Sequence, residues 1–115
     1  MGAFVISKKF NGEYKFAFTS RKGKTIFTSK GYELKFECEL DIEKLKANID
    51  IGVYHKQKHS GGKYGFKLII DDSLTVTSRK YSTELRVQKG IDEINRYVDK
   101  AEILDFSVGD LIFED

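Results

Sequence analysis

Two histidines, one cysteine and a doubled Ser-x-x-Tyr motif are the residues of this 115-residue chain whose types and spacing come closest to chemistry. On a helix, His55 and His59 would lie on one side and could share a metal ion. On a strand they share a face but lie about 13 Å apart at ~3.3 Å per residue, too far for one ion to bridge. Because the neighbouring residues alternate as in a strand, we expect a solvated pair on an exposed sheet face and no metal site.

Cys38 is expected to be a small buried side chain, because it falls on the apolar side of a predicted helix. The half of the chain that contains it has no histidine to act as a base. The run Gly61-Gly62-Lys63 lacks the spaced first glycine and the following Ser or Thr of a phosphate-binding loop. We therefore predict that the protein is not an enzyme and has no catalytic residue, metal or cofactor.

The Ser-x-x-Tyr motif occurs as Ser29 with Tyr32 and as Ser78 with Tyr81, each time before a predicted helix. One interpretation is that these groups donate hydrogen bonds to an anion at a helix N-terminus. The other is that the hydroxyl satisfies the turn while the aromatic ring packs under the helix. We favour the structural role, because the motif appears in both halves of the chain.

An internal repeat organises the chain, since residues 4–50 align with residues 54–99. The matches lie at turns, core positions and helix starts. The offset is fifty residues up to the second hairpin loop and forty-nine after it, because that loop is one residue shorter in the second copy. The aligned pairs are Phe4 with Tyr54, Gly12 with Gly62, Tyr14 with Tyr64, Phe16 with Phe66, Tyr32 with Tyr81 and Ile42 with Ile91. We interpret this as two copies of one supersecondary unit in a single domain of residues 1–115.

Within each copy the hydrophobic period changes from two to that of a helix. Residues 4–30 alternate as three strands, with hairpin turns at Asn11-Gly12 and Lys22-Gly23. Helical spacing of apolar residues then predicts helices over 33–49 and 83–98, the second capped by Ser82 or Thr83. A closing strand is expected within residues 101–107, followed by a short tail, 108–115.

The predicted fold class is α+β, with two tandem β-β-β-α repeats that share one antiparallel sheet. Neither unit of about fifty residues could bury a sheet face alone, so both helices are expected on one face of the common sheet. The strand over 53–59 is expected to close the first unit and open the second.

Cross-strand pairing of Lys8 with Tyr14, Phe4 with Phe18 and Tyr54 with Leu68 divides the strand residues between two faces. The core face then collects Phe4, Ile6, Tyr14, Phe16, Phe18, Phe27, Tyr54, Tyr64, Phe66, Leu68 and Val76. The other face, here called the open face, collects Lys9, Glu13, Lys15, Ile26, Thr28, Lys30, His55, Gln57, His59, Lys63, Lys67, Thr75, Thr77 and Arg79.

Charge is distributed unevenly along the chain. The strand segments, residues 1–32 and 51–81, carry a net charge of +10, whereas the helix and tail segments carry −8. A cationic open face would attract polyanions. The candidate polyanion-binding residues are Lys9, Lys15, Lys30, Lys63, Lys67 and Arg79.

Two functions are weighed. The first is a non-enzymatic binding or interaction module, supported by the lack of a nucleophile–base pair or metal cluster. The alternative is a weak, salt-sensitive nucleic-acid binder that uses the open face. Proteins that read single strands stack bases on exposed aromatic rings, and here the aromatic residues are predicted to be buried. The partner, a protein or a nucleic acid, is not specified by the sequence.

The doubled pattern resembles the YegP-like family of small bacterial and archaeal proteins. The resemblance covers about residues 3–107 and rests on Phe4-Val5-Ile6-Ser7-Lys8, Asn11-Gly12, Tyr14-x-Phe16, Ser29-x-x-Tyr32, Gly62, Tyr64-x-Phe66, Ser78-x-x-Tyr81, Gly90-Ile91 and Ala101 to Phe106. It implies two units sharing one sheet with exchanged closing strands, and hence a pseudo-dimer. It implies no activity or site residue. Two departures are Leu40-Asp41, where a glycine is usual before the isoleucine, and a link between repeats that lacks its usual proline.

The remaining expectations concern location and assembly. A single cysteine suits a reducing compartment, and no apolar run is long enough to span a membrane, so we expect a cytoplasmic protein without a membrane partner. We expect a monomer, with a homodimer as the alternative. The acidic tail from Asp110 to Asp115 is hypothesised to lie across the basic face.

Overall fold

The computed structural model describes residues 2–107 and has the predicted order of strands and helices. In the first half the elements are β1 (Ala3–Lys8), β2 (Tyr14–Thr19), β3 (Thr25–Thr28), α1 (Lys35–Asn48) and the 3-10 turn η1 (Ile49–Ile51). In the second half they are β4 (Val53–His59), β5 (Lys63–Ile70), β6 (Leu74–Ser78), α2 (Glu84–Tyr97), the 3-10 turn η2 (Val98–Lys100) and β7 (Glu102–Asp105). The hypothesis about the tail from Asp110 to Asp115 lies outside the described residues.

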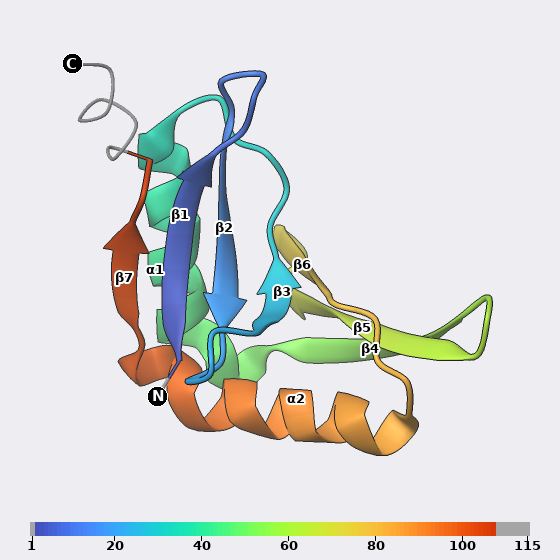
Figure 1. Cartoon of the computed structure of the whole chain (residues 1–115). Coiled ribbons are helices and arrows are strands. Elements are labelled where there is room, and N and C mark those ends of the chain that lie inside the picture. Colours follow the sequence, from blue (N-terminus) through green and yellow to red (C-terminus); the bar gives the residue numbers. More distant parts are fainter. Residues whose placement is uncertain (1, 108–115) are drawn as a thin grey trace.

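The strands form one mixed sheet in the order β4-β5-β6-β3-β2-β1-β7, which confirms the α+β class (Figure 1). Neighbouring strands are antiparallel except β1 and β7, which are parallel. The expectation of a purely antiparallel sheet is therefore wrong at this edge. β7 reaches β1 only after the α2 crossover, and a crossover connection of this kind permits parallel pairing.

The predicted register of both hairpins is confirmed. Lys8 lies opposite Tyr14 and Phe4 opposite Phe18, while Tyr54 lies opposite Leu68. This register places the rings of Phe4, Phe16, Phe18, Phe27 and Phe66 in the core, each at most 1% exposed. The Phe4 and Phe18 ring centroids lie 5.3 Å apart.

One residue of the predicted open face lies in the core instead. Ile26 is 4% exposed, as part of the same apolar cluster as Phe27, which is fully buried. The pairing of β2 with β3 shifts register between Phe18 and Thr19. Such a bulge breaks the strict alternation of a strand, so two consecutive residues of β3 can both turn inward.

The two outer edges of the sheet differ. β7 covers the outer edge of β1, and beyond it the Phe106 amide donates to the Ile6 carbonyl over 2.9 Å. β4 pairs only with β5 in the described part of the chain. In the described residues, 53–59 therefore do not pair with a strand of the first half, as the prediction that they close it would require.

Each helix packs on the strands of its own half. α1 contacts β2 and lies behind β1 and β2 in Figure 1, whereas α2 contacts β5 and runs beneath β4 and β5. α2 begins at the predicted cap, where Thr83 Oγ1 accepts from the Arg86 amide over 3.1 Å. α1 begins after Leu34, whose amide donates to the Glu37 carboxylate. No helix in residues 2–107 has the length and apolar composition needed to cross a membrane.

Both Ser-x-x-Tyr motifs have the predicted structural role. Ser29 Oγ accepts from the Phe16 amide over 2.9 Å and donates to the Lys30 carbonyl over 2.7 Å. Ser78 makes the same two bonds, to the Phe66 amide and the Arg79 carbonyl, at the same lengths. These hydroxyls fix the chain where it leaves the sheet for each helix.

β7 is fastened to α1 by a charged contact. The Lys35 ammonium pairs with the Asp105 carboxylate, which also accepts from the amide and hydroxyl of Ser107. Burial raises the pKa of Asp105, but the hydrogen bonds from Lys35 and Ser107 outweigh it and hold that pKa below its usual value. Lys46 Nζ adds a bond to the Ala101 carbonyl over 2.7 Å.

We predict that Asp105→Asn lowers the free energy of unfolding at pH 7 by about 1 kcal/mol, because it removes the charged contact of β7 with α1. The carboxylate has a depressed pKa, so its contribution is complete above its unfolded pKa of about 3.9 and is lost as the pH falls through the folded value. Urea titrations from pH 7 to pH 2 should therefore show a steeper acid loss for the wild type than for the variant. Asp99→Asn, which removes an exposed carboxylate, is the matched control; equal acid slopes in the wild type and Asp105→Asn would contradict the prediction.

Candidate anion-binding groove

A groove runs between the β2–β3 turn and α2. It consists of two adjoining cavities, of about 570 Å³ and about 410 Å³, that share Ser20, Arg86, Lys89 and Glu93. The cations that line the two cavities, here called the groove cations, are Arg21, Lys22, Lys24, Lys63, Arg79, Lys80, Arg86, Lys89 and Arg96. Only Asp92 and Glu93 oppose them as lining acids.

The β2–β3 turn forms one wall of the groove and is held by its own backbone. The Ser20 amide donates to the Lys24 carbonyl and the Gly23 amide to the Ser20 carbonyl, both over 2.8 Å. Gly23 has a φ of 82°, which glycine adopts without steric cost. This tight turn directs the three basic residues Arg21, Lys22 and Lys24 away from the core, and all three are exposed to solvent.

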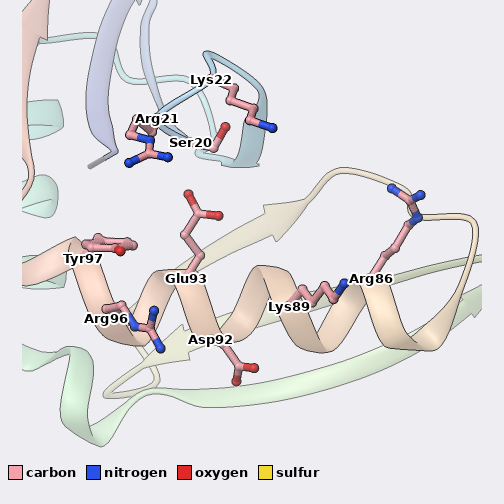
Figure 2. Close-up of a pocket in the computed structure, with 9 residues that line it drawn as sticks. All are labelled: Ser20, Arg21, Lys22, Arg86, Lys89, Asp92, Glu93, Arg96 and Tyr97. Atoms are coloured by element: carbon pink, nitrogen blue, oxygen red, sulfur yellow. The ribbon is translucent and has the colours of Figure 1, made fainter.

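α2 forms the other wall. Arg86, Lys89, Glu93 and Arg96 follow one another at helical spacing, so they share one side of the helix. Figure 2 shows Glu93 and Arg86 rising on the side of the turn and Lys89 lying along the helix, whereas Arg96 and Asp92 point away from the turn. Asp92 accepts instead from Gln88 Nε2 over 2.9 Å. Glu93 is thus the one acid directed at the turn among the residues drawn.

Tyr81 determines how close α2 lies to the sheet. The ring is 8% exposed, and a Cβ added at Gly90 would come within 2.6 Å of its hydroxyl. The Arg79 guanidinium lies over the ring, 5.1 Å from its centroid. Burial raises the pKa of Tyr81, although the charge of Arg79 opposes this shift. The neutral phenol therefore acts as a spacer that holds Arg79 beside the cations of α2.

The charges of the groove cations are not neutralised by ion pairs with acidic side chains in the described residues. Within residues 2–107, ion pairs form only between Lys9 and Glu13 and between Lys35 and Asp105, and neither pair lies in the groove. Clustered cations in a concave surface focus the positive potential and raise the local concentration of anions. Ammonium and guanidinium groups are also the usual donors to phosphate oxygens. The arrangement is chemically suited to hold an anion with several negative charges.

The six cations predicted from the sequence lie in four different environments. Lys15 and Lys67 occupy open-face positions of β2 and β5, opposite Ser7 and Thr77 respectively. Lys63 and Arg79 line the groove. Lys9 pairs with Glu13, and Lys30 lies over the Tyr32 ring at 5.2 Å.

Sequence reasoning missed the cations that α2 contributes to the groove. The net charge of residues 82–115 is acidic, and this sum conceals a basic stripe within the segment. The available signal was the spacing of Arg86, Lys89 and Arg96, three and seven residues apart, which places them on one side of a helix. The turn cations Arg21, Lys22 and Lys24 belong to the basic segment of residues 1–32, but the alternation of strand residues assigns no sheet face to a turn.

The histidines and the cysteine lie outside the groove. His55 and His59 are both in β4, opposite Lys67 and Lys63, as the strand interpretation predicted. Cys38 is fully buried in α1, which confirms its predicted packing role. Burial raises the pKa of the Cys38 thiol to about 12, and the nearby carboxylates Glu39, Asp41 and Asp105 add to the shift. The thiol is therefore protonated and inaccessible at neutral pH.

Comparison with known proteins finds no matching family model, but it does find similar proteins. The UPF0339 protein YegP of Escherichia coli K12 is 28% identical over 95 residues, which cover 81% of this chain and 86% of that protein. The solution NMR structure of E. coli yegP, described as a protein of unknown function, has a TM-score of 0.81 at 26% identity, covering 92% of this chain and 93% of that one. A UPF0339 protein of Shewanella oneidensis has a TM-score of 0.83 at 26% identity, covering 93% and 92%. These matches support a YegP-like family.

One departure from the YegP-like pattern now has a physical explanation. In the second half, Gly90 leaves room for the Tyr81 hydroxyl. In the first half the corresponding residue is Asp41, and Tyr32 donates to its carboxylate over 2.6 Å. Burial raises the pKa of Tyr32 strongly, and the hydrogen bond to Asp41 raises it further. In the first half, the hydrogen bond between Tyr32 and Asp41 thus takes the place of the close approach between Tyr81 and Gly90 in the second half.

We predict that Gly90→Ala destabilises the protein by about 1–2 kcal/mol, because its methyl group would overlap the Tyr81 hydroxyl. Without that contact, alanine in a helix would be favoured over glycine by about 1 kcal/mol. Adding Tyr81→Phe to Gly90→Ala should recover part of the loss. Denaturant unfolding of the two single variants and the double variant measures this, and a more stable Gly90→Ala protein would show that the close approach does not constrain α2.

We predict that Cys38 does not react with a thiol reagent such as DTNB at pH 8 while the protein is folded, because the thiol is buried and protonated. In denaturant the same thiol should react at the rate of a free cysteine. Absorbance at the wavelength of the released thiolate measures both rates. Rapid labelling of the folded protein would mean that α1 opens readily.

Proposed function

We propose that the protein is a non-enzymatic binding module whose ligand is a phosphate-bearing polyanion held in the groove between the β2–β3 turn and α2. The observation that carries this proposal is the gathering of cations on both walls of one cavity, with Glu93 the acid directed between them in Figure 2. Arg86 and Arg96 are ten residues apart on α2, so the basic side of the helix extends over about 15 Å. This length suits a ligand with more than one phosphate.

The rest of the structure supports binding over catalysis. The described residues contain no group of three potential metal ligands. The groove itself is lined by permanently charged cations and contains neither histidine nor cysteine among its lining residues. Such a surface can hold and orient an anion, and the groups in its lining that could act as a general base are the carboxylates of Asp92 and Glu93.

The doubled structure supports the proposal of two tandem units, 4–50 and 54–99, with both helices on one face of the shared sheet. Ser29 and Ser78 make equivalent hydrogen bonds. An isolated antiparallel β-bridge joins the backbones of Tyr14 and Tyr32, and an equivalent β-bridge joins those of Tyr64 and Tyr81. On this view the chain is a pseudo-dimer in one domain. A cytoplasmic location, in which the single cysteine Cys38 stays reduced, also remains part of the proposal.

A second candidate function is weak nucleic-acid binding on the open face. Lys15 and Lys67 favour it, because they occupy strand positions on that face and Lys67 is exposed. The mechanism would be attraction to the phosphate backbone, with little selection of sequence. The two candidates use different cations and can be separated by charge reversal.

The test compares two double variants with the same change in net charge. We predict that Arg86→Glu with Lys89→Glu weakens binding of inorganic tripolyphosphate at least about tenfold, because it reverses two cations of the groove, whereas Lys15→Glu with Lys67→Glu leaves the affinity nearly unchanged. Calorimetric titration at two salt concentrations measures both, and circular dichroism checks the fold.

A mixed-sequence oligonucleotide is titrated in parallel. Loss of oligonucleotide binding only in the Lys15 and Lys67 double variant would favour the second candidate. If neither double variant changes the binding of either probe, both proposals are wrong.

A further inference from the structure

β7 occupies a slot beside the first half of the sheet. It pairs in parallel with β1 from Ala3 to Ile6, and its Asp105 reaches Lys35 at the start of α1. Ser107, just beyond β7, is only 7% exposed. The slot is thus bounded by the outer edge of β1 and the first turn of α1, and an extended segment fills it.

The second half has the same slot, but no described residue fills it. The outer edge of β4 has no described partner, and a cavity of about 230 Å³ is lined by residues of β4, of β5 and of the first turn of α2. Its lining includes Lys56, Glu84 and Val87, which correspond in the repeat to Ile6, Lys35 and Cys38 of the filled slot. We call this cavity with the outer edge of β4 the β4 slot. It shares no lining residue with the anion-binding groove.

The lining of the β4 slot indicates what would bind there. Lys56 stands where Ile6 stands in the filled slot, and Lys58 lies two residues further along β4. With Glu84 as the one lining acid, the slot is net positive. Val53, at the start of the same edge, is 54% exposed. An extended segment that places apolar residues beside Val53 and acidic residues beside Lys56 and Lys58 matches these features, whereas a second β4 would bring like charges together.

The chain itself contains such a segment. β7 reads Glu-Ile-Leu-Asp, and residues 110–115 read Asp-Leu-Ile-Phe-Glu-Asp. Within one molecule this segment cannot reach the β4 slot. β7 and β4 are at opposite edges of the sheet (Figure 1), separated by six strand spacings, or about 29 Å at ~4.8 Å each. The four residues from Ser107 to Leu111 span at most about 14 Å.

We propose that residues 110–115 of a second copy of this chain bind in the β4 slot, as an added strand parallel to β4. The occupant supplies hydrogen bonds to the free edge of β4 and acidic side chains to Lys56 and Lys58. This association is independent of the anion-binding groove, so either proposal can fail without the other.

The experiment measures self-association of the full-length protein by sedimentation velocity over a range of concentrations. We predict a concentration-dependent increase in sedimentation for the wild type. Ile112→Asp in the donor segment and Lys58→Glu in the slot should each raise the concentration of half-association at least about tenfold. Lys100→Glu, which makes the same charge change at an exposed site outside the slot, should associate like the wild type.

An equimolar mixture of the Ile112→Asp and Lys58→Glu proteins provides the decisive control. The first protein retains an intact slot and the second an intact donor segment, so the mixture should associate although neither protein does so alone. Amide NMR signals of Lys56 and Lys58 should shift with concentration in the wild type. A wild type that stays monomeric without such shifts, or an Ile112→Asp protein that associates like the wild type, would overturn the proposal.

Discussion

The contact between Tyr81 and Gly90 determines where α2 lies, and the basic groove depends on that position. The buried ring holds the helix close to the sheet at one glycine, while its other side supports the Arg79 guanidinium. The Ser78 hydroxyl, bonded to the Phe66 amide and the Arg79 carbonyl, fixes the chain just before this point. Cations from the turn, from the link before α2 and from α2 itself therefore meet across one cavity.

The two halves share this scaffold but have diverged in charge. Where α2 has Gly90, α1 has Asp41, bonded to Tyr32. Where α1 begins with Lys35, paired with Asp105, α2 begins with Glu84. The serine hydrogen bonds before each helix are the same in both halves, whereas the contact of the tyrosine with the helix and the outward-facing positions differ. This is the pattern expected when packing constrains the interior and leaves the exterior free to vary.

Much of the fold could be predicted because the signals were local. The assumed length of the hairpin loop set the predicted register of β1 with β2, and helical spacing located α1 and α2 within two residues of each end. Ile26 was placed wrongly because a bulge is a local change of register that alternation cannot reveal. The groove was missed because it joins a turn to a helix more than sixty residues away, and summing charge along the chain does not report such a meeting.

The parallel pairing of β7 with β1 joins the last described strand to the first, with Ala3 opposite Glu102. Contacts of such large sequence separation form slowly, because a long loop must close first. During synthesis on a ribosome, β1 and α1 emerge long before β7 exists. A nascent chain halted before residue 102 therefore exposes the outer edge of β1 and leaves Lys35 without its carboxylate. The first half of the protein is completed only when the second half has been made.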